Sequence, residues 1–225
     1  MDMVVLDKVS RDYRVGSTTI AAVKSTSLAI EKGSFASIVG HSGSGKTTLL
    51  SLIGGMVAPT SGRVLFNGTD ISTWNSDRLS EYRCERIGFM FQSASLLPIL
   101  TAKENLLLPV AFRTLPAAAG QERRAEELLR AVGLGDKIDA YPAHLSGGQQ
   151  RRVAIARAFM NDPEIILADE PTGDLDEETE NEMIQFFLRM NREQGTTFLM
   201  VTHNSDLAGQ AKKHFRMAQG VLQPA

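Results

Sequence analysis

The sequence predicts an α/β fold: a core with a parallel sheet, an antiparallel β subdomain, and an inserted α-helical subdomain. Three observations support this prediction. Short apolar runs bounded by Gly, Pro or Asp alternate with stretches of helical periodicity, which is typical of α/β proteins. The first thirty residues instead contain alternating β-type segments around a turn at residues 15–18, a pattern typical of antiparallel pairing. Residues from about Ser93 to Phe159 hold no convincing strand, so we expect a helical insert there.

The strands of the core are predicted from uninterrupted apolar runs, which favour strands that are buried on both faces. These runs are residues 35–39, 87–91, 165–168 and 196–201. Two amphipathic helices are predicted from apolar residues spaced three and four apart. Their stripes are Ala125, Leu128, Leu129 and Val132 in one helix, and Met183, Phe186, Phe187 and Met190 in the other. We interpret both stripes as core packing.

The chain has 225 residues, and we expect one domain over residues 1–225. Within it, residues 1–92 and 160–225 form the core, and residues 93–159 form the helical insert. The net charge is −2, which gives no electrostatic reason to expect a nucleic acid as partner. Cys84 is the one cysteine, which excludes an internal disulfide and suits a reducing cytosol.

The sequence predicts that any association with a membrane comes through a partner. The first residues show no apolar core of a signal peptide. No stretch approaches the ~20 apolar residues that a membrane helix needs.

A phosphate-binding loop is predicted at Gly40–Thr47, "GHSGSGKT", between an expected strand and an expected helix. Its glycines let successive backbone N–H groups point into one concavity at a helix N-terminus, where they can hold phosphate oxygens. Lys46 would add a cation for the β- and γ-phosphates, and the Thr47 hydroxyl could bind Mg²⁺.

An acidic pair follows the apolar run 165–168. Asp169 is placed to hold the Mg²⁺ shell, and Glu170 is placed to polarise an attacking water. An acidic pair at the end of a strand is common, but beside a phosphate loop it becomes a strong signal. A glutamate at position 170 favours hydrolysis over simple nucleotide binding.

A second anion-binding loop is predicted in "LSGGQQRR", residues 145–152. Ser146 is a good N-cap residue, and Gly147 and Gly148 would leave N–H groups exposed at the start of a helix. An ordinary capped helix is the alternative interpretation of this stretch by itself.

With these motifs in view, the chain resembles the nucleotide-binding subunit of ATP-binding cassette (ABC) transporters over nearly its whole length. The motifs occur in the order of that family: the phosphate loop, Gln92 in "FMFQ", the signature "LSGGQ", the acidic strand, the loop "GDLD", and His203 in "VTHN". The resemblance implies a RecA-like core of the P-loop NTPase fold and Mg²⁺-dependent hydrolysis of ATP, coupled to transport.

The resemblance also implies why two anion loops are present. In this family two subunits pair head to tail, and each ATP lies between the phosphate loop of one and the signature loop of the other. Ser146 and the amides of Gly147 and Gly148 would then bind the γ-phosphate held by Lys46 of a second copy, with Gln149 near the ribose.

Roles for the remaining residues follow from the same resemblance. Tyr13 would stack on adenine, although a lone tyrosine is more often ordinary packing. Gln92 would touch the Mg²⁺ and water site and report the γ-phosphate to a membrane subunit. His203 would contact the γ-phosphate and orient Glu170. Residues 174–176 would cross the dimer interface, where Asp176 can also cap a helix.

The expected site residues fall into three groups. The nucleotide contacts are Tyr13, Gly40, His41, Ser42, Gly43, Ser44, Gly45, Lys46, Thr47 and Thr48, together with Ser146, Gly147, Gly148 and Gln149 toward the second copy. The catalytic residues are Lys46, Gln92, Glu170 and His203, and the Mg²⁺ ligands are Thr47, Gln92 and Asp169. No chemistry is expected of Arg123, Arg124, Arg151 and Arg152, which we expect on solvated faces or at an interface rim.

Three further stretches resemble the lipoprotein-releasing and macrolide-exporter group within the family. They are "SGSGKTTLLSLIGGMVAPTSGRVLFNG", "LLPILTAKENLLLP" and "YPAHLSGGQQRRVAIARA". His41 and Asp174 depart from the residues that are common at their positions. This resemblance implies export or mechanotransmission of a lipoprotein, drug or peptide, through an integral membrane permease at the cytoplasmic face of the inner membrane.

Alternatives from other classes are an importer ATPase subunit, a soluble ABC protein that acts on ribosomes or DNA, and a small-molecule kinase. Ribosomal ABC proteins usually carry two cassettes, and those that handle DNA ends carry long coiled-coil inserts, neither of which is present. A kinase would leave the signature, Gln92 and His203 without a role.

Overall fold

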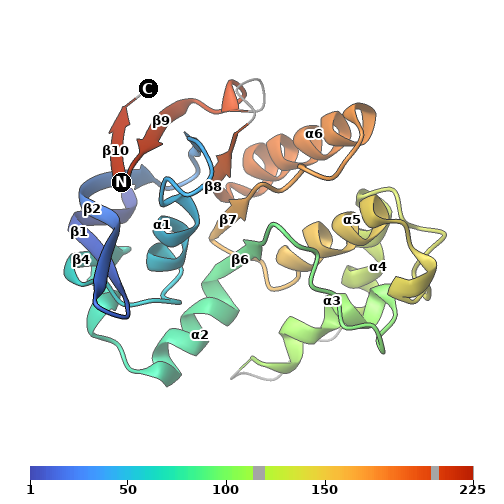
Figure 1. The fold of residues 1–225 in the computed structure, drawn as a ribbon. Helices are drawn as coiled ribbons and strands as arrows, with labels where there is room; N and C mark the ends of the chain where they lie inside the picture. Colours follow the sequence, from blue (N-terminus) through green and yellow to red (C-terminus); the bar gives the residue numbers. More distant parts are fainter. Residues whose placement is uncertain (114–119, 204–207, 225) are drawn as a thin grey trace. The chain divides into compact units, whose positions relative to one another are not determined.

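The computed structural model of the chain describes residues 1–113, 120–203 and 208–224, and it is drawn in Figure 1. Two compact units are distinguished. The first comprises Met1–Tyr82 with Thr197–Ala225, and the second comprises Arg83–Thr196. The helical insert expected over residues 93–159 falls wholly within the second unit. Across the described ranges, no helix combines the length and the apolar character that crossing a bilayer requires.

The first unit contains the antiparallel sheet that the sequence predicts. β1 (Asp2–Val15) and β2 (Thr18–Glu31) pair antiparallel around a turn in which Gly16 has a φ of 62°. Two strands that the sequence analysis missed, β4 (Ser61–Phe66) and β5 (Thr69–Asp70), extend this sheet in the order β2-β1-β4-β5. The turn and the first pairing are confirmed, and the sheet is larger than predicted.

The same unit holds parallel strands that carry the phosphate loop. β3 (Phe35–Val39) lies between β8 (Thr197–Thr202) and β9 (Lys213–Ala218), and both neighbours run parallel to it. β10 (Val221–Pro224) pairs antiparallel with β9. The predicted strands 35–39 and 196–201 are therefore confirmed, the second with a shift of one residue.

The described residues of the first unit also form helical elements. α1 (Lys46–Ile53) follows the phosphate loop, and most of its residues are buried. η1 (Ile71–Thr73) leads into α2 (Ser76–Arg86), the element in which the first unit passes into the second. Tyr82 is the buried residue of α2, and its hydroxyl donates to the Ile53 carbonyl at 3.0 Å.

The second unit is built on two parallel strands. β6 (Ile87–Met90) and β7 (Ile165–Asp169) pair in register from Ile87 with Ile165 to Met90 with Ala168. The prediction that the first strand continues to residue 91 is wrong. Phe91 leaves the ladder, and its side chain is 43% exposed.

The helical elements that the structure describes between β6 and the end of the second unit are α3 (Ala102–Ala111), α4 (Gln121–Ala131), η2 (Pro142–His144), α5 (Gly147–Ala158) and α6 (Glu177–Gln194). Of these, α3, α4 and α5 lie together, and the longer α6 follows β7 in the chain (Figure 1). No strand occurs over residues 93–113 and 120–159, the part of the predicted insert that the structure describes.

The two amphipathic stripes are confirmed as core. All eight of their side chains are buried, with exposures between 0% and 7%. α6 begins as predicted, because the Asp176 carboxylate accepts from the Thr179 N–H at 3.0 Å. Hydrogen bonds from Thr179 hold the pKa of Asp176 below its usual value.

A fully buried amide, Asn105, fixes the segment before α3. Its side chain accepts from the Leu97 N–H at 2.8 Å and donates to the carbonyls of Leu97, Leu100 and Thr101 at 3.0–3.2 Å. An asparagine with all of these bonds stabilises a loop that has no backbone hydrogen bonds to a neighbouring strand among the described residues.

Replacing Asn105→Ala should lower the free energy of unfolding by about 2 kcal/mol, because backbone groups lose their buried partner. Urea denaturation followed by circular dichroism measures the change. The control is Asn181→Ala on the exposed face of α6, which should stay within about 0.5 kcal/mol of the parent. Equal midpoints for the two variants would contradict the role of Asn105.

Candidate functional site

The phosphate loop connects β3 to α1 in the first unit. Gly43 and Gly45 have φ angles of 75° and 106°, in the left-handed region that side chains avoid. Gly45 is the N-cap of α1, so the loop ends with the free N–H groups of a helix N-terminus. This is the geometry that the motif predicts for an anion-binding loop.

Carbonyl oxygens of neighbouring strands lie very close to the backbone of this loop. A β-carbon at Gly45 would lie 2.2 Å from the Ala22 oxygen, and one at Gly40 would lie 2.2 Å from the Met217 oxygen. The Gly220 N–H donates to the Ser44 carbonyl at 2.9 Å, from the turn between β9 and β10. The loop is therefore held on a fixed path by strands distant in sequence.

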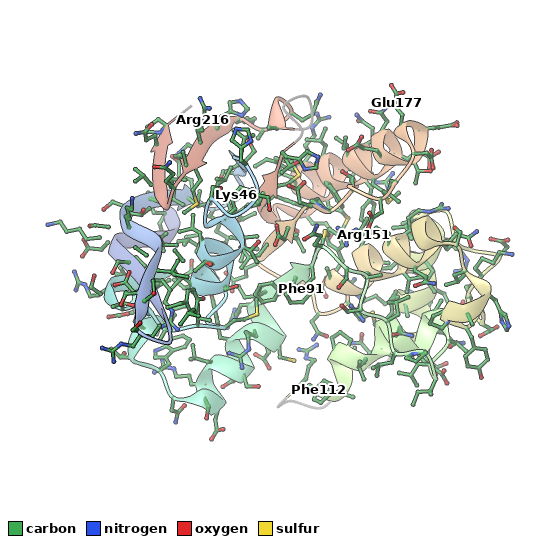
Figure 2. All side chains as sticks on the ribbon, in the orientation of Figure 1. Lys46, Phe91, Phe112, Arg151, Glu177 and Arg216 are labelled. Atoms are coloured by element: carbon green, nitrogen blue, oxygen red, sulfur yellow. The ribbon has the colours of Figure 1, made fainter. Side chains whose placement is uncertain are left out.

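The polar side chains of the loop fit a phosphate group. Lys46, labelled in Figure 2, is 8% exposed, and its ammonium donates to the carbonyls of Gly40 and His41 at 2.7 and 3.1 Å. The Ser44 hydroxyl is buried and has no hydrogen-bond partner among the described residues. A buried cation and a buried, unpaired hydroxyl in one loop suit a ligand that supplies anionic oxygens.

Two other expected site residues lie in the first unit. Tyr13 is half-buried on β1, and the Arg11 guanidinium carbon lies 4.6 Å from its ring centroid. Arg11 also donates to the Ala58 carbonyl at 2.8 Å, which fixes the cation over the ring. His203 directly follows β8, as expected, and is exposed.

The acidic pair closes β7 in the second unit. Asp169 is the last residue of the strand and is 8% exposed. Glu170 has a φ of 47°, a conformation that costs a residue with a side chain about 1 kcal/mol. Such strain persists only where the surroundings hold the backbone, and it is frequent at catalytic positions. Gln92 lies two residues beyond β6 and is exposed.

The signature loop is the N-terminus of α5. Ser146 accepts from the Gln149 N–H at 3.2 Å, and the Gln149 side chain accepts from the Ser146 N–H at 2.9 Å. The predicted cap is therefore a full capping box, with Gln149 as its second member.

Gly147 is a glycine that the fold itself does not require. It lies in helical conformation outside the positive-φ region, and a β-carbon there would meet no atom within 4 Å. A β-carbon at Gly148 would make only an ordinary contact with Leu175, at 3.4 Å. Alanine would stabilise the helix better at such a position, so no contact within the described part of the chain requires a glycine there.

The expectation that four arginines lie on solvated faces or at an interface rim is wrong for Arg151. Its side chain is buried at 3% exposure and donates to the carbonyls of Phe91, Glu170 and Pro171, the last at 2.7 Å. Three carbonyl oxygens replace the water that the guanidinium loses. Burial lowers the pKa of Arg151, while the carboxylates of Asp174, Asp169 and Glu170 act in the opposite direction.

The other three arginines differ among themselves. Arg123 is exposed as expected and pairs with Glu127 at 3.1 Å. Arg124 and Arg152 are half-buried and donate to backbone carbonyls, Arg124 to Phe159 and Met160 at 2.9 and 3.0 Å. Their charge predicted a solvated face or an interface rim, but the guanidinium groups of Arg124 and Arg152 donate to backbone carbonyls.

The sequence does contain a signal for the burial of Arg151. Ala154 and Ile155 follow it by three and four residues and are both buried, so Arg151 lies on the apolar face of α5. Arg157, six residues after Arg151, donates to the carbonyls of Ala94 and Ser95 at 2.9 and 3.1 Å. The sequence analysis expected no chemistry of Arg151 and made no prediction for Arg157.

Comparison with known proteins decides the family. The family model described as "ABC transporter" matches residues 23–173, more than half of the chain. The chain belongs to the ABC transporter family. It is an ATP-binding subunit of that family with an ABC ATPase domain, as the motifs predict.

Relatives along the whole chain support this membership. The ABC transporter ATP-binding protein YtrE of Bacillus subtilis is 41% identical over 98% of this chain and 96% of its own length. The lipoprotein-releasing system ATP-binding protein LolD of Syntrophus aciditrophicus is 41% identical over 98% of both chains. The macrolide export ATP-binding/permease protein MacB of Syntrophobacter fumaroxidans is 41% identical over all of this chain, which spans 32% of MacB.

A solved structure confirms the fold class. The ATP-binding cassette MJ0796, in a dimeric post-hydrolysis state bound to ADP and Pi, superposes with a TM-score of 0.93. It is 39% identical and covers 99% of this chain and 98% of its own. The P-loop NTPase-type core of this ABC subunit is thereby established.

Mg²⁺ has no all-protein cage among the described residues, because no three His, Cys, Asp or Glu side chains there form a group that could hold a metal. Mg²⁺ usually binds through one or two protein oxygens together with phosphates and water. Thr47, Gln92 and Asp169 stay the predicted ligands.

Replacing Gly45→Ala should weaken ATP binding by more than about tenfold, since the β-carbon would overlap the Ala22 oxygen and force the loop to move. Isothermal titration with MgATP measures the effect. The matched control is Gly68→Ala, in the turn between β4 and β5, where a β-carbon would meet no atom within 4 Å and alanine adds only left-handed strain. Equal losses for the two variants would show that the backbone path at Gly45 is not what binding requires.

Proposed function

We propose that this subunit closes head to tail with a second copy around two ATP molecules and drives an integral membrane permease through that motion. Gly147 is the observation that carries this proposal. It is a helix-compatible, unobstructed glycine at the exposed start of α5, where an alanine would favour the monomer. The dimeric state of MJ0796 and the family membership support the same arrangement.

At each nucleotide, the amides of the phosphate loop and the Lys46 ammonium would hold the β- and γ-phosphates. On binding, the ammonium would exchange the carbonyls of Gly40 and His41 for phosphate oxygens. Tyr13 would stack on adenine, with Arg11 behind its ring. The phosphate site would also be lined by His41, Ser42, Ser44 and Thr48.

The hydrolytic groups would act on the γ-phosphate. Glu170 would accept a proton from the attacking water, and His203 would orient Glu170 and contact the γ-phosphate. Mg²⁺, bound by Thr47, Gln92 and Asp169, would neutralise charge that develops on the phosphate oxygens. From the second copy, Ser146 and the amides of Gly147 and Gly148 would complete the γ-phosphate site, with Gln149 near the ribose.

Export or mechanotransmission is the proposed use of this motion. The support comes from relatives named for lipoprotein release and macrolide export, together with the three stretches that resemble that group. The subunit would then work at the cytoplasmic face of the inner membrane on a permease, with a lipoprotein, drug or peptide as cargo. Co-purification of the permease from native membranes in mild detergent tests this assignment, and recovery of ribosomes or DNA alone would overturn it.

Replacing Gly147→Ala should give effects of opposite sign on stability and activity. The monomer should gain about 0.5 kcal/mol, because alanine restricts the unfolded chain and fits the helix. ATPase activity should fall about tenfold or more, because a methyl group would come between the amide and the nucleotide. Urea unfolding and a phosphate-release assay measure the two effects.

The matched control for Gly147→Ala is Gly68→Ala, in the turn between β4 and β5. Gly68 has a φ of 78° with no atom near its missing β-carbon, so alanine should destabilise the chain without lowering the ATPase rate. If Gly147→Ala kept full activity, the signature loop would not be approached closely by a nucleotide.

Replacing Glu170→Gln should reduce hydrolysis by at least about 100-fold and leave a stable dimer in MgATP, because the proton acceptor is lost while both binding loops remain. Sedimentation velocity with and without ATP measures the dimer. Adding Ser146→Arg to this variant should keep it monomeric while MgATP binding to the phosphate loop is retained. A double variant that still dimerised would overturn the head-to-tail arrangement.

A further inference from the structure

The structure contains a buried cation for which neither the family motifs nor the proposed function gives a role. Arg151 is the fifth residue of α5, and its guanidinium binds three carbonyls that follow the ends of two strands. Phe91 follows β6 directly, and Glu170 and Pro171 follow β7. Figure 2 labels Arg151 and Phe91.

Each of these carbonyls is next to a group with a proposed catalytic role. The Phe91 carbonyl belongs to the peptide unit that leads into Gln92, so binding it fixes the backbone of Gln92. The Glu170 carbonyl belongs to the residue held at a φ of 47°. Hydrogen bonds from Arg151 to the carbonyls of Glu170 and Pro171 hold the two peptide units that follow the strained residue.

The three carbonyls require a planar side chain with several donors in fixed directions, which is the guanidinium of arginine. The guanidinium presents its donors in fixed directions, and here Nε, Nη1 and Nη2 each reach a different carbonyl. The acceptors are backbone groups, so the bonds do not depend on the protonation of a carboxylate. They control the position of the backbone directly.

α5 also binds the backbone on the C-terminal side of Gln92. Arg157 donates to the carbonyls of Ala94 and Ser95, and Ser95 has a φ of 45°. Residues 91–95 are thus bound at both ends by arginines of α5. The helix that begins at the signature loop sets the course of the chain around Gln92.

We infer that Arg151 is a positioning residue for ATP hydrolysis: its guanidinium sets the backbone on which Gln92 and Glu170 stand, relative to the helix that begins at Ser146. This inference rests on the proposed roles of Gln92 and Glu170. Any shift at the start of α5 passes to both of these residues through one rigid planar group.

Replacing Arg151→Lys tests the inference, because lysine keeps the charge and loses the fork. The kcat for ATP should fall about tenfold or more, since small displacements of reacting groups slow a reaction strongly. The Kd of MgATP, measured by isothermal titration, should stay within about twofold, because the phosphate loop is not touched. Arg151→Gln, which removes the charge as well, should show the same separation of kcat from Kd.

The matched control is Arg124→Gln. Arg124 also caps two carbonyls of the same unit and pairs with Asp162, but none of these groups adjoins Gln92 or Glu170. Its melting temperature should fall about as much as that of Arg151→Lys, while its kcat should stay within about twofold of the parent.

The outcomes separate the inference from the proposed function. If Glu170→Gln hydrolysed ATP at the parental rate, the proposed mechanism would fail. If Glu170→Gln were inactive while Arg151→Lys matched Arg124→Gln in kcat, only the positioning role would be overturned. If neither Arg151→Lys nor Arg151→Gln folded, Arg151 would be a determinant of folding, and the positioning role would likewise be overturned.

Discussion

Hydrogen bonds from cationic side chains to backbone carbonyls are the interaction on which the functional segments of this protein depend. Lys46 binds two carbonyls at the start of its own loop, and Arg151 binds three at the ends of two strands. A carbonyl dipole compensates a buried charge only in part, so the cation stays attractive to a strong anion. These segments form few backbone hydrogen bonds with neighbouring strands, and the bonds from the cations fix their backbone conformation.

Gly45 and Arg151 occupy opposite kinds of backbone environment, one too crowded for a side chain and one with carbonyls that need a partner. At Gly45 the backbone runs so close to the Ala22 oxygen that a side chain has no space. Around Arg151 the backbone leaves carbonyls without partners, and a long side chain fills the space and bonds them. Both arrangements exist because the catalytic segments follow strand ends, where pairing stops and each backbone group must find another partner.

The sequence was informative where a local pattern determines the structure. The phosphate loop, the caps at Ser146 and Asp176, and the apolar stripes follow from spacings of a few residues, and the structure confirms them. β4 was missed because its pairing with β1 is non-local. Arg151 was misjudged because charged residues are usually exposed, and its three acceptors come from turns far apart in sequence. The chemical roles of the site residues stay predictions, since they depend on groups beyond one chain.

The anchoring of Asn105 has a consequence for any molecule that covers the segment before α3. Leu97 and Ile99 are 42% and 78% exposed, yet the backbone of this segment is bound at Leu97, Leu100 and Thr101. The conformational entropy of this backbone is lost when the chain folds, not when it associates. Covering these two side chains would therefore release their hydration water with little further ordering of the backbone, which lowers the entropic cost of an association there.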